Sequence, residues 1–231
     1  MELLNSLVGQ INDILWSYVL IILLIGAGII FTIRTKFVQI RFIKEMIRLI
    51  AGDVGNKMEG QQISSFQAFC VSTASRVGVG NIAGIAIAVV LGGPGAIFWM
   101  WIIAILGSAT GFVESTLAQI YKVPRTDSNG YLGGPAYYIN NALHSPKTAV
   151  FFAILISVTY GLIFNSVQSN TISLSLQTAF NFDATMIGIV IAIFSGIVVF
   201  GGLHRIAKVT EYMVPIMAGI YLLIAFAITI Y

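Results

Sequence analysis

Charged and chemically reactive side chains are scarce in this chain of 231 residues. Only 9% of the residues are Asp, Glu, Lys or Arg, and the chain has two histidines and one cysteine, Cys70. So few charges cannot cover a water-soluble globule of this size. A lone cysteine excludes an intrachain disulfide and a cysteine-rich metal site. His144 and His204 fall in expected loops, and no cluster of Ser, His and an acid lies within the apolar segments. An enzyme is therefore not expected.

Apolar residues are what the chain has in excess: 58% of it is hydrophobic and the mean hydropathy is +0.93. Runs of about 17 to 25 apolar residues are long enough to cross a hydrocarbon core. The first such run has no basic residue before it and no small-residue cleavage site after it, so we expect a retained helix rather than a signal peptide. The runs predict an all-α, polytopic membrane helical bundle with spans near residues 14–33, 64–90, 95–121, 148–180, 184–203 and 211–231.

Positive charges are confined to three of the connections, and Arg76 is the one Lys or Arg inside an expected span. The segments 1–13, 91–94 and 181–183 carry only acidic charges. Because cytoplasmic loops are enriched in Lys and Arg, we expect a multi-pass protein of the cytoplasmic membrane with both termini outside. The cytoplasmic connections then hold Arg34, Lys36, Arg41, Lys44, Arg48 and Lys57; Lys122, Arg125 and Lys147; and Arg205 and Lys208.

The segment 35–50, "TKFVQIRFIKEMIRLI", alternates apolar residues at helical spacing with basic ones. This pattern is typical of a helix that lies in the membrane interface, with one face in lipid and its cations near anionic headgroups. A short cytoplasmic helix packed on the bundle would show the same pattern. Both interpretations remain open. The apolar positions are Phe37, Ile40, Ile43, Met46, Ile47 and Ile50.

The stretch "SRVGVGNIAGIAIAVVLGGPGAIFWMW", residues 75–101, is apolar yet rich in residues that break helices. Unwound backbone survives in a membrane only where protein or a water-filled cavity surrounds it. A break near "GVGN", residues 78–81, would expose amides that attract a carboxylate and carbonyls that suit a sodium ion. Such discontinuous helices mark the binding sites of secondary transporters. The alternative is that Gly80 and Gly84 only allow helices to pack closely.

Five segments occur in one order: "GVGNIAGIA", "GGPGAIFWMW", "ESTLAQIYK", "GGPAYYI" and "NSVQSNTIS". Together they resemble the alanine or glycine:cation symporter family, from about residue 10 to the carboxy terminus. The resemblance implies a leucine-transporter-like fold. In it, residues 1–60 form an accessory transmembrane helix and a cytoplasmic interfacial helix. Residues 61–231 form the first five-helix repeat, with a broken helix near 76–82.

The resemblance also implies sodium-coupled symport of small neutral amino acids, chiefly alanine and glycine, with sodium as coupling ion and no other cofactor. The expected partners are the amino acid and membrane lipid, with no nucleic acid. Family members are about twice this length, so we expect a truncated or half chain that lacks the second repeat or uses a second copy. A non-transporting scaffold or inactive fragment is the alternative. A channel is disfavoured because no repeated filter signature is present.

Carried over by position, the resemblance implies that the backbone at Gly78, Val79, Gly80 and Asn81 binds the substrate carboxylate. The polar side chains expected to face the break are those of Asn165, Gln168 and Asn170. Asn165 and Gln168 are three residues apart and share a helical face, although polar contacts between helices would give the same spacing.

Backbone carbonyls near Ala74 and Val77 are the expected sodium ligands in this chain, again through the resemblance. Arg76 and Glu114 are the charged residues expected within spans. Isolated charges in a membrane usually pair or line a water-filled path, so an Arg76–Glu114 pair is expected, with either a gating or a purely structural role.

Overall fold

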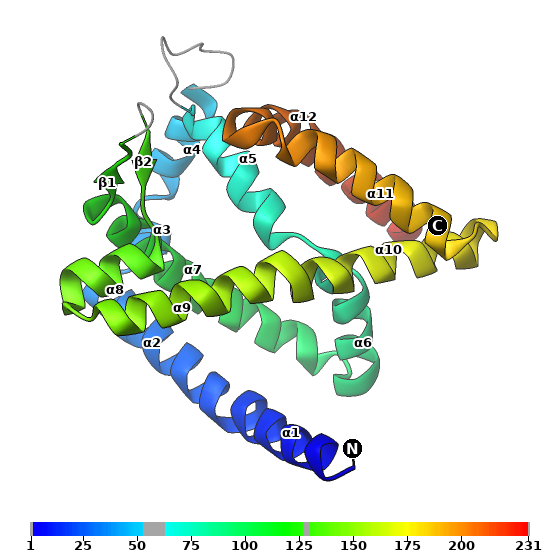
Figure 1. Ribbon diagram of the computed structural model, residues 1–231, viewed down its shortest axis with the longest axis horizontal. Helices are drawn as coiled ribbons and strands as arrows, with labels where there is room; N and C mark the ends of the chain where they lie inside the picture. The colour runs from blue at the N-terminus through cyan, green and yellow to red at the C-terminus, as the bar shows by residue number, and fades with distance from the viewer. Residues whose placement is uncertain (1, 53–62, 127–129, 231) are drawn as a thin grey trace. The chain divides into compact units, whose positions relative to one another are not determined.

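A computed structural model describes residues 2–52, 63–126 and 130–230 and confirms the all-α class. Lys57, expected in the first basic connection, lies outside the described residues. In chain order, the elements in Figure 1 are α1 (Glu2–Ile14), the π-helical segment η1 (Leu15–Val19), α2 (Leu20–Arg34), α3 (Val38–Arg41), α4 (Ile43–Gly52), α5 (Ser65–Arg76), the 3-10 turn η2 (Val79–Asn81), α6 (Ala83–Gly92), α7 (Gly95–Ile120), β1 (Val123–Pro124), β2 (Tyr131–Leu132), α8 (Pro135–Leu143), α9 (Pro146–Val158), the π-helical segment η3 (Thr159–Phe164), α10 (Asn165–Phe180), α11 (Ala184–Val199) and α12 (Gly202–Ile230).

Several described helices are long and apolar enough to cross a membrane, which supports a multi-pass membrane protein. α5 and the segment Val79–Gly92 form one further span if they are counted together, with a bend of 73° between them. α11 is apolar but has 16 residues, somewhat fewer than the roughly 20 that a straight crossing needs. The long spans are Leu4–Arg34, Gly95–Ile120, Pro146–Phe180 and Gly202–Ile230.

Two helices begin well before the bounds expected from hydropathy. The first starts at Glu2 rather than near residue 14, because apolar residues continue at helical spacing toward the amino terminus. The last starts at Gly202 rather than near residue 211. Its charged residues recur every three positions and so share one side of the helix, where polar side chains do not interrupt it. These residues are Arg205, Lys208 and Glu211.

The chain forms two compact units, and one of them comprises residues 1–44 and 88–152. Within it α2 packs against α7. A Cβ atom at Gly28 would lie 2.8 Å from the Cβ of Leu106, so the glycine allows the two helix backbones to approach closely. The short helix α3 also contacts α7, and Val38 at its start is buried.

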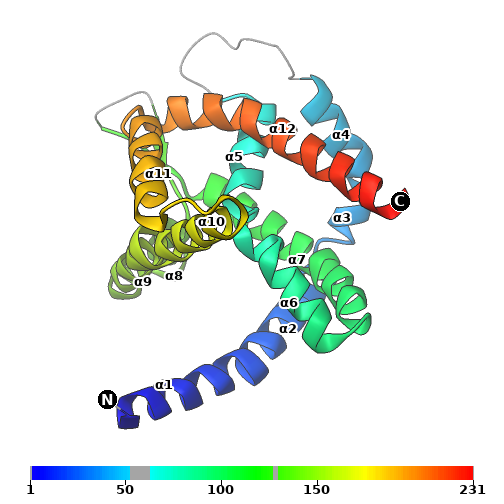
Figure 2. The ribbon, with the colours of Figure 1, turned by 90° about the vertical axis from the view of Figure 1, so that its right-hand side faces the viewer.

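The other unit comprises residues 45–87 and 153–231. Its helices contact one another in chain order, α10 with α11 and α11 with α12, and α5 packs along α12. Figure 2 shows α5 and α12 side by side. The turn between α10 and α11 ends in a helix cap. The Asp183 carboxylate, just before α11, accepts a hydrogen bond from the Met186 N–H at 2.9 Å.

Contacts between α5 and α12 hold the first half of the broken span. Ser64 caps α5 by accepting the Gln67 N–H at 3.1 Å, a helix-start arrangement favoured by its sequence. The Gln67 side chain then donates to the Glu211 carboxylate on α12 at 2.9 Å. Cys70 on α5 and Ala207 on α12 are almost fully buried. Small buried residues together with a polar bond are typical of closely packed membrane helices.

Replacing Ala207 by leucine is expected to destabilise this unit, because three further carbon atoms must enter a site that is 1% exposed. Overpacking of this kind costs about 1–3 kcal/mol. The midpoint of thermal unfolding in detergent should fall. Ala218→Leu, at an exposed position of the same helix, is the matched control. Equal midpoints for the two variants would contradict tight packing at Ala207.

Candidate functional site

The broken span is the centre of the candidate site. α5 ends at Arg76, η2 spans Val79–Asn81 and α6 begins at Ala83. Between the helices, Val77 (φ −94°, ψ 107°) and Gly78 (φ −133°, ψ −172°) are extended, so their backbone groups leave the helical hydrogen-bond ladder. Figure 1 shows α6 leaving the break in a different direction from α5.

Two side chains accept hydrogen bonds from backbone amides that lose their helical partners at the break. The Gly78 N–H donates to the Asn81 Oδ1 at 3.1 Å, and the Val79 N–H donates to the Gln168 Oε1 of α10 at 2.9 Å. The Gly80 N–H has no acceptor among the described residues. Because these two bonds replace helical hydrogen bonds that the break removes, Asn81 and Gln168 stabilise the unwound conformation, and Gly80 keeps a donor open.

The Gln168 carboxamide lies close against Gly78. A Cβ atom at residue 78 would lie 2.6 Å from the Gln168 Nε2 and 3.2 Å from its Cδ, so the end of the Gln168 side chain would have to move. At Gly80 and Gly84 an added Cβ would meet nothing within 4 Å. Within the described residues neither glycine lies close against a neighbouring segment, and close helix packing stays the alternative role for them.

The carboxyl end of α5 presents carbonyl groups. The last carbonyls of any helix lack intrahelical donors, and no backbone N–H among the described residues donates to those of Ala74 or Val77. Oxygen atoms of this kind are the ligands that hard cations prefer. Both residues line the same hollow as the open amide of Gly80, so anion donors and cation ligands lie together at the break.

This hollow, about 410 Å³ in volume, lies between the break and the start of α10. Asn165 and Gln168 line it, so the structure brings these two expected residues to the break. Tyr160 and Phe164 also line it, which we did not expect from the sequence. They belong to η3, and a π-helical segment shifts the helical register, so regular spacing could not place them.

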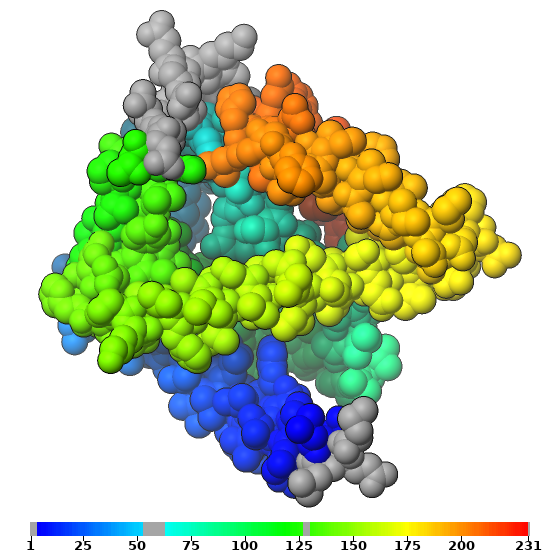
Figure 3. All heavy atoms as spheres, in the orientation of Figure 1, coloured from blue at the N-terminus to red at the C-terminus, as the bar shows by residue number. Residues whose placement is uncertain are grey.

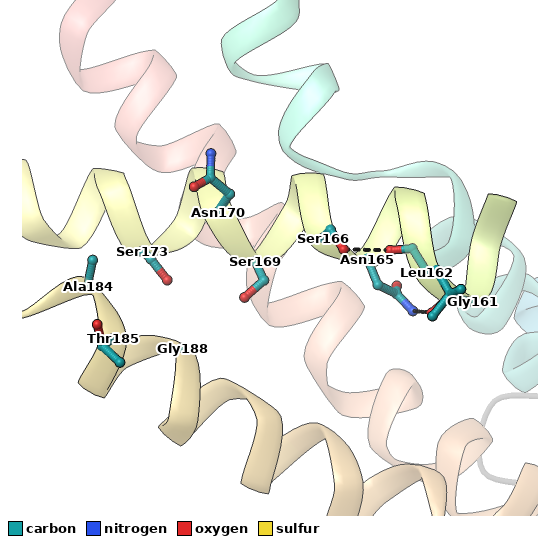
Figure 4. Close-up of a pocket in the computed structure, with 10 residues that line it drawn as sticks. All are labelled: Gly161, Leu162, Asn165, Ser166, Ser169, Asn170, Ser173, Ala184, Thr185 and Gly188. Atoms are coloured by element: carbon teal, nitrogen blue, oxygen red, sulfur yellow. Dashed lines mark hydrogen bonds between the residues drawn. The ribbon is translucent and has the colours of Figure 1, made fainter. Parts of the chain in front are cut away.

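A second hollow of about 580 Å³ lies between α10 and α11. Figure 3 shows an open wedge between these helices, which meet at their connecting turn. In Figure 4 the hydroxyls of Ser169 and Ser173 point toward α11, whereas Asn170 points away from it. Asn165 lines both hollows, but Asn170 lines only this one. The structure therefore does not bring Asn170 to the break.

Serine spacing within the family-like segment "NSVQSNTIS" of α10 is the sequence signal for this second hollow, which we did not expect from hydropathy. Ser166, Ser169 and Ser173 follow one another at intervals of three and four, so they form one polar stripe on α10. Ser173 is buried, with 6% of its surface exposed. Hydroxyls along one side of an apolar span indicate a face that meets protein or water rather than lipid.

The two charges expected within spans have other neighbours in the described structure. The Arg76 guanidinium donates to the Ser72 hydroxyl and to the Ser72 carbonyl. Glu114 is on α7, in the other unit, near Tyr138 of α8. Burial, and secondly the charge of Glu114, raise the pKa of the Tyr138 phenol. The Arg76–Glu114 pair stays a prediction.

Two of the family-like segments meet in that unit. "ESTLAQIYK" forms the end of α7, and "GGPAYYI" includes the start of α8. A Cβ atom at Gly133 would lie 2.9 Å from the Ala118 carbonyl oxygen. Glycine at residue 133 therefore allows the loop before α8 to lie against the last turns of α7.

Comparison with known proteins decides the family. The model of the sodium:alanine symporter family matches residues 1–231. The chain belongs to the sodium:alanine symporter family. The family consists of transporters and not enzymes, and it is a family of sodium-coupled amino-acid symporters.

Curated relatives agree with this membership. The chain is 52% identical to the probable sodium/glutamine symporter GlnT of Bacillus subtilis, over 97% of this chain and 46% of GlnT. It is 50% identical to the amino-acid carrier protein AlsT of the same organism, over 98% of this chain and 47% of AlsT. It is 38% identical to the sodium/alanine symporter AgcS of Methanococcus maripaludis, over 94% of this chain and 49% of AgcS. The chain thus spans about half the length of the curated relatives it matches.

Proposed function

We propose that this chain supplies the amino-terminal repeat of a sodium-coupled symporter for small neutral amino acids, with alanine and glycine as substrates. It does so in the cytoplasmic membrane, with both termini outside and the basic loops in the cytoplasm. The observation that carries the proposal is the break between α5 and α6, where open carbonyls and an open amide line one hollow.

The substrate carboxylate binds at residues 78–81 in this proposal. The amides of Gly78 and Val79 already have acceptors, so the Gly80 N–H is the open donor among these three. The positive end of the α6 dipole adds attraction for a carboxylate. Gln168 positions the loop by holding the Val79 amide. Asn165 lines the hollow at the break and contacts the substrate. Of the two hollows, Asn170 lines only the second one, between α10 and α11.

Sodium binds at the carbonyl end of α5. Ala74 and Val77 contribute backbone oxygens, whose lone pairs are free to coordinate the ion because no described amide donates to them. The rest of the ion's shell comes from outside this chain, from a second repeat or a second copy. Arg76 and Glu114 pair across the same pathway, either as a gate or as a structural bridge.

A non-transporting scaffold is the second candidate. Alternating access by rocking one bundle against another uses both repeats.

Uptake of alanine into proteoliposomes under a sodium gradient tests the proposal. The chain is reconstituted alone and together with the separately expressed carboxy-terminal half of GlnT, and that half alone is the control. We expect uptake with the two halves together and its loss when sodium is replaced by potassium. Uptake by the chain alone would support a second copy as partner. No uptake in any preparation would contradict the symporter and favour the scaffold.

A further inference from the structure

The corner that follows the first span is a rigid turn. Lys36 and Phe37 both have positive φ, 54° and 55°, a conformation that non-glycine residues rarely adopt. The Phe37 N–H donates to the Thr32 carbonyl at 2.8 Å, and the Gln39 side chain donates to the Thr32 hydroxyl at 2.9 Å. Val38, next in the chain, is 1% exposed. These contacts fix the corner at the end of a span whose last residue is Arg34.

α4 follows this corner and has two unlike sides. Lys44, Glu45 and Arg48 lie on one side of it, and Arg48 and Glu45 form an ion pair at 2.9 Å. The other side, which we call the apolar face of α4, carries large hydrophobic residues at intervals of three and four. The apolar face consists of Ile43, Met46, Ile47 and Ile50.

The apolar face of α4 is not covered by the rest of the described chain. Ile47 is 62% exposed and Ile43 is 47% exposed, and α4 makes no extensive contact with any other described helix. A cytoplasmic helix packed on the bundle would bury these side chains. Left in water, such a face would be costly.

We propose that α4 lies in the cytoplasmic interface of the membrane, with its apolar face among the acyl chains and its cations on anionic lipid headgroups. Charge complementarity favours anionic lipid, because Lys44 and Arg48 of α4, together with Arg41 at the end of α3, outnumber the one carboxylate of Glu45. The corner at Lys36 and Phe37 also favours a place in the interface. It follows directly after Arg34, the last residue of the first span. This lipid-binding surface needs no transport activity, and its assignment to the cytoplasmic side rests on the topology proposed above.

Site-directed fluorescence tests the proposal with the full chain in vesicles. Cys70 is 0% exposed and is the only cysteine, so Cys70→Ala gives a background without reactive thiols. An environment-sensitive dye is attached at Ile47→Cys on the apolar face, or at Glu45→Cys on the opposite side as matched control. The vesicles consist of phosphatidylcholine with or without phosphatidylglycerol.

We expect the dye at position 47 to emit at shorter wavelength, to be quenched by spin-labelled lipid and to be shielded from aqueous iodide. The dye at position 45 should behave in the opposite way. The double variant Lys44→Gln/Arg48→Gln should reduce the lipid quenching at position 47 more in phosphatidylglycerol vesicles than in pure phosphatidylcholine.

Three outcomes would overturn the proposal. Shielding of position 47 from both iodide and spin-labelled lipid would mean that α4 packs on protein. Equal iodide quenching at positions 45 and 47 would mean that α4 lies in water. The same lipid quenching with and without phosphatidylglycerol would mean that the cations of α4 do not select anionic lipid.

Discussion

Replacing Gly78 by alanine is expected to reduce sodium-driven alanine uptake by about 5-fold to 30-fold. The added Cβ would lie 2.6 Å from the Gln168 Nε2, so either the carboxamide or the loop must move. Movement of either weakens the Val79–Gln168 hydrogen bond, because its acceptor belongs to the same carboxamide. Leaving this half-buried amide without its acceptor costs about 1–2 kcal/mol, and about 1.4 kcal/mol corresponds to a factor of ten.

Gly80→Ala is the matched control, because a Cβ atom at Gly80 would meet nothing within 4 Å. Uptake is measured with the chain and the carboxy-terminal half of GlnT together. Hydrogen–deuterium exchange over residues 77–82 of the chain alone gives a second readout that needs no transport. We expect faster exchange in Gly78→Ala than in Gly80→Ala. Indistinguishable uptake and exchange in the two variants would contradict the close approach of Gln168.

Replacing Gln168 by leucine should have an effect of similar size for the same reason. Leucine keeps most of the side-chain volume but cannot accept the Val79 N–H, so the amide loses its partner. We expect a loss of about 5-fold to 30-fold in uptake, from the cost of one unsatisfied half-buried amide. Because Gln168 positions the loop, the maximal rate should fall at least as much as the apparent affinity.

A double-mutant cycle separates this bond from general damage. If Gly78→Ala and Gln168→Leu break the same bond, the double variant should lose much less than the product of the single losses. Asn170→Leu, on the same helix but away from the break hollow, serves as the control and should combine with Gly78→Ala multiplicatively. A lower KM for alanine in Gln168→Leu would show instead that the carboxamide competes with the substrate.

Local sequence was a good guide to the helices and to their interruption. Long apolar runs specify spans because unpaired backbone cannot face lipid, and the described spans lie where those runs are. The glycine-rich stretch beginning at residue 78 falls where the helix stops and resumes. Hydropathy placed the first residues of α1 and α12 too late in the sequence. Charged residues on one side of a helix lower a window average without ending the helix, as Arg205 and Lys208 illustrate.

The candidate site could be predicted only in part. The "GVGN" segment was found because glycine and asparagine in an apolar run are locally unusual. Tyr160 and Phe164 were missed because a π-helical segment shifts their register. Asn165, Gln168 and Asn170 are polar residues of one helix. Which of them reach the break depends on the direction in which each side chain leaves α10.

The sequence by itself determined the class of protein, the apolar spans and the place of the break, because these depend on composition and on residues close together in the chain. Only the tertiary structure decided that Gln168 accepts the Val79 amide across 89 positions, and that Gly78 leaves room for it. It likewise showed that α4 leaves its apolar face uncovered. These features depend on how distant segments pack, and no local pattern of apolar and polar residues encodes the distance between them.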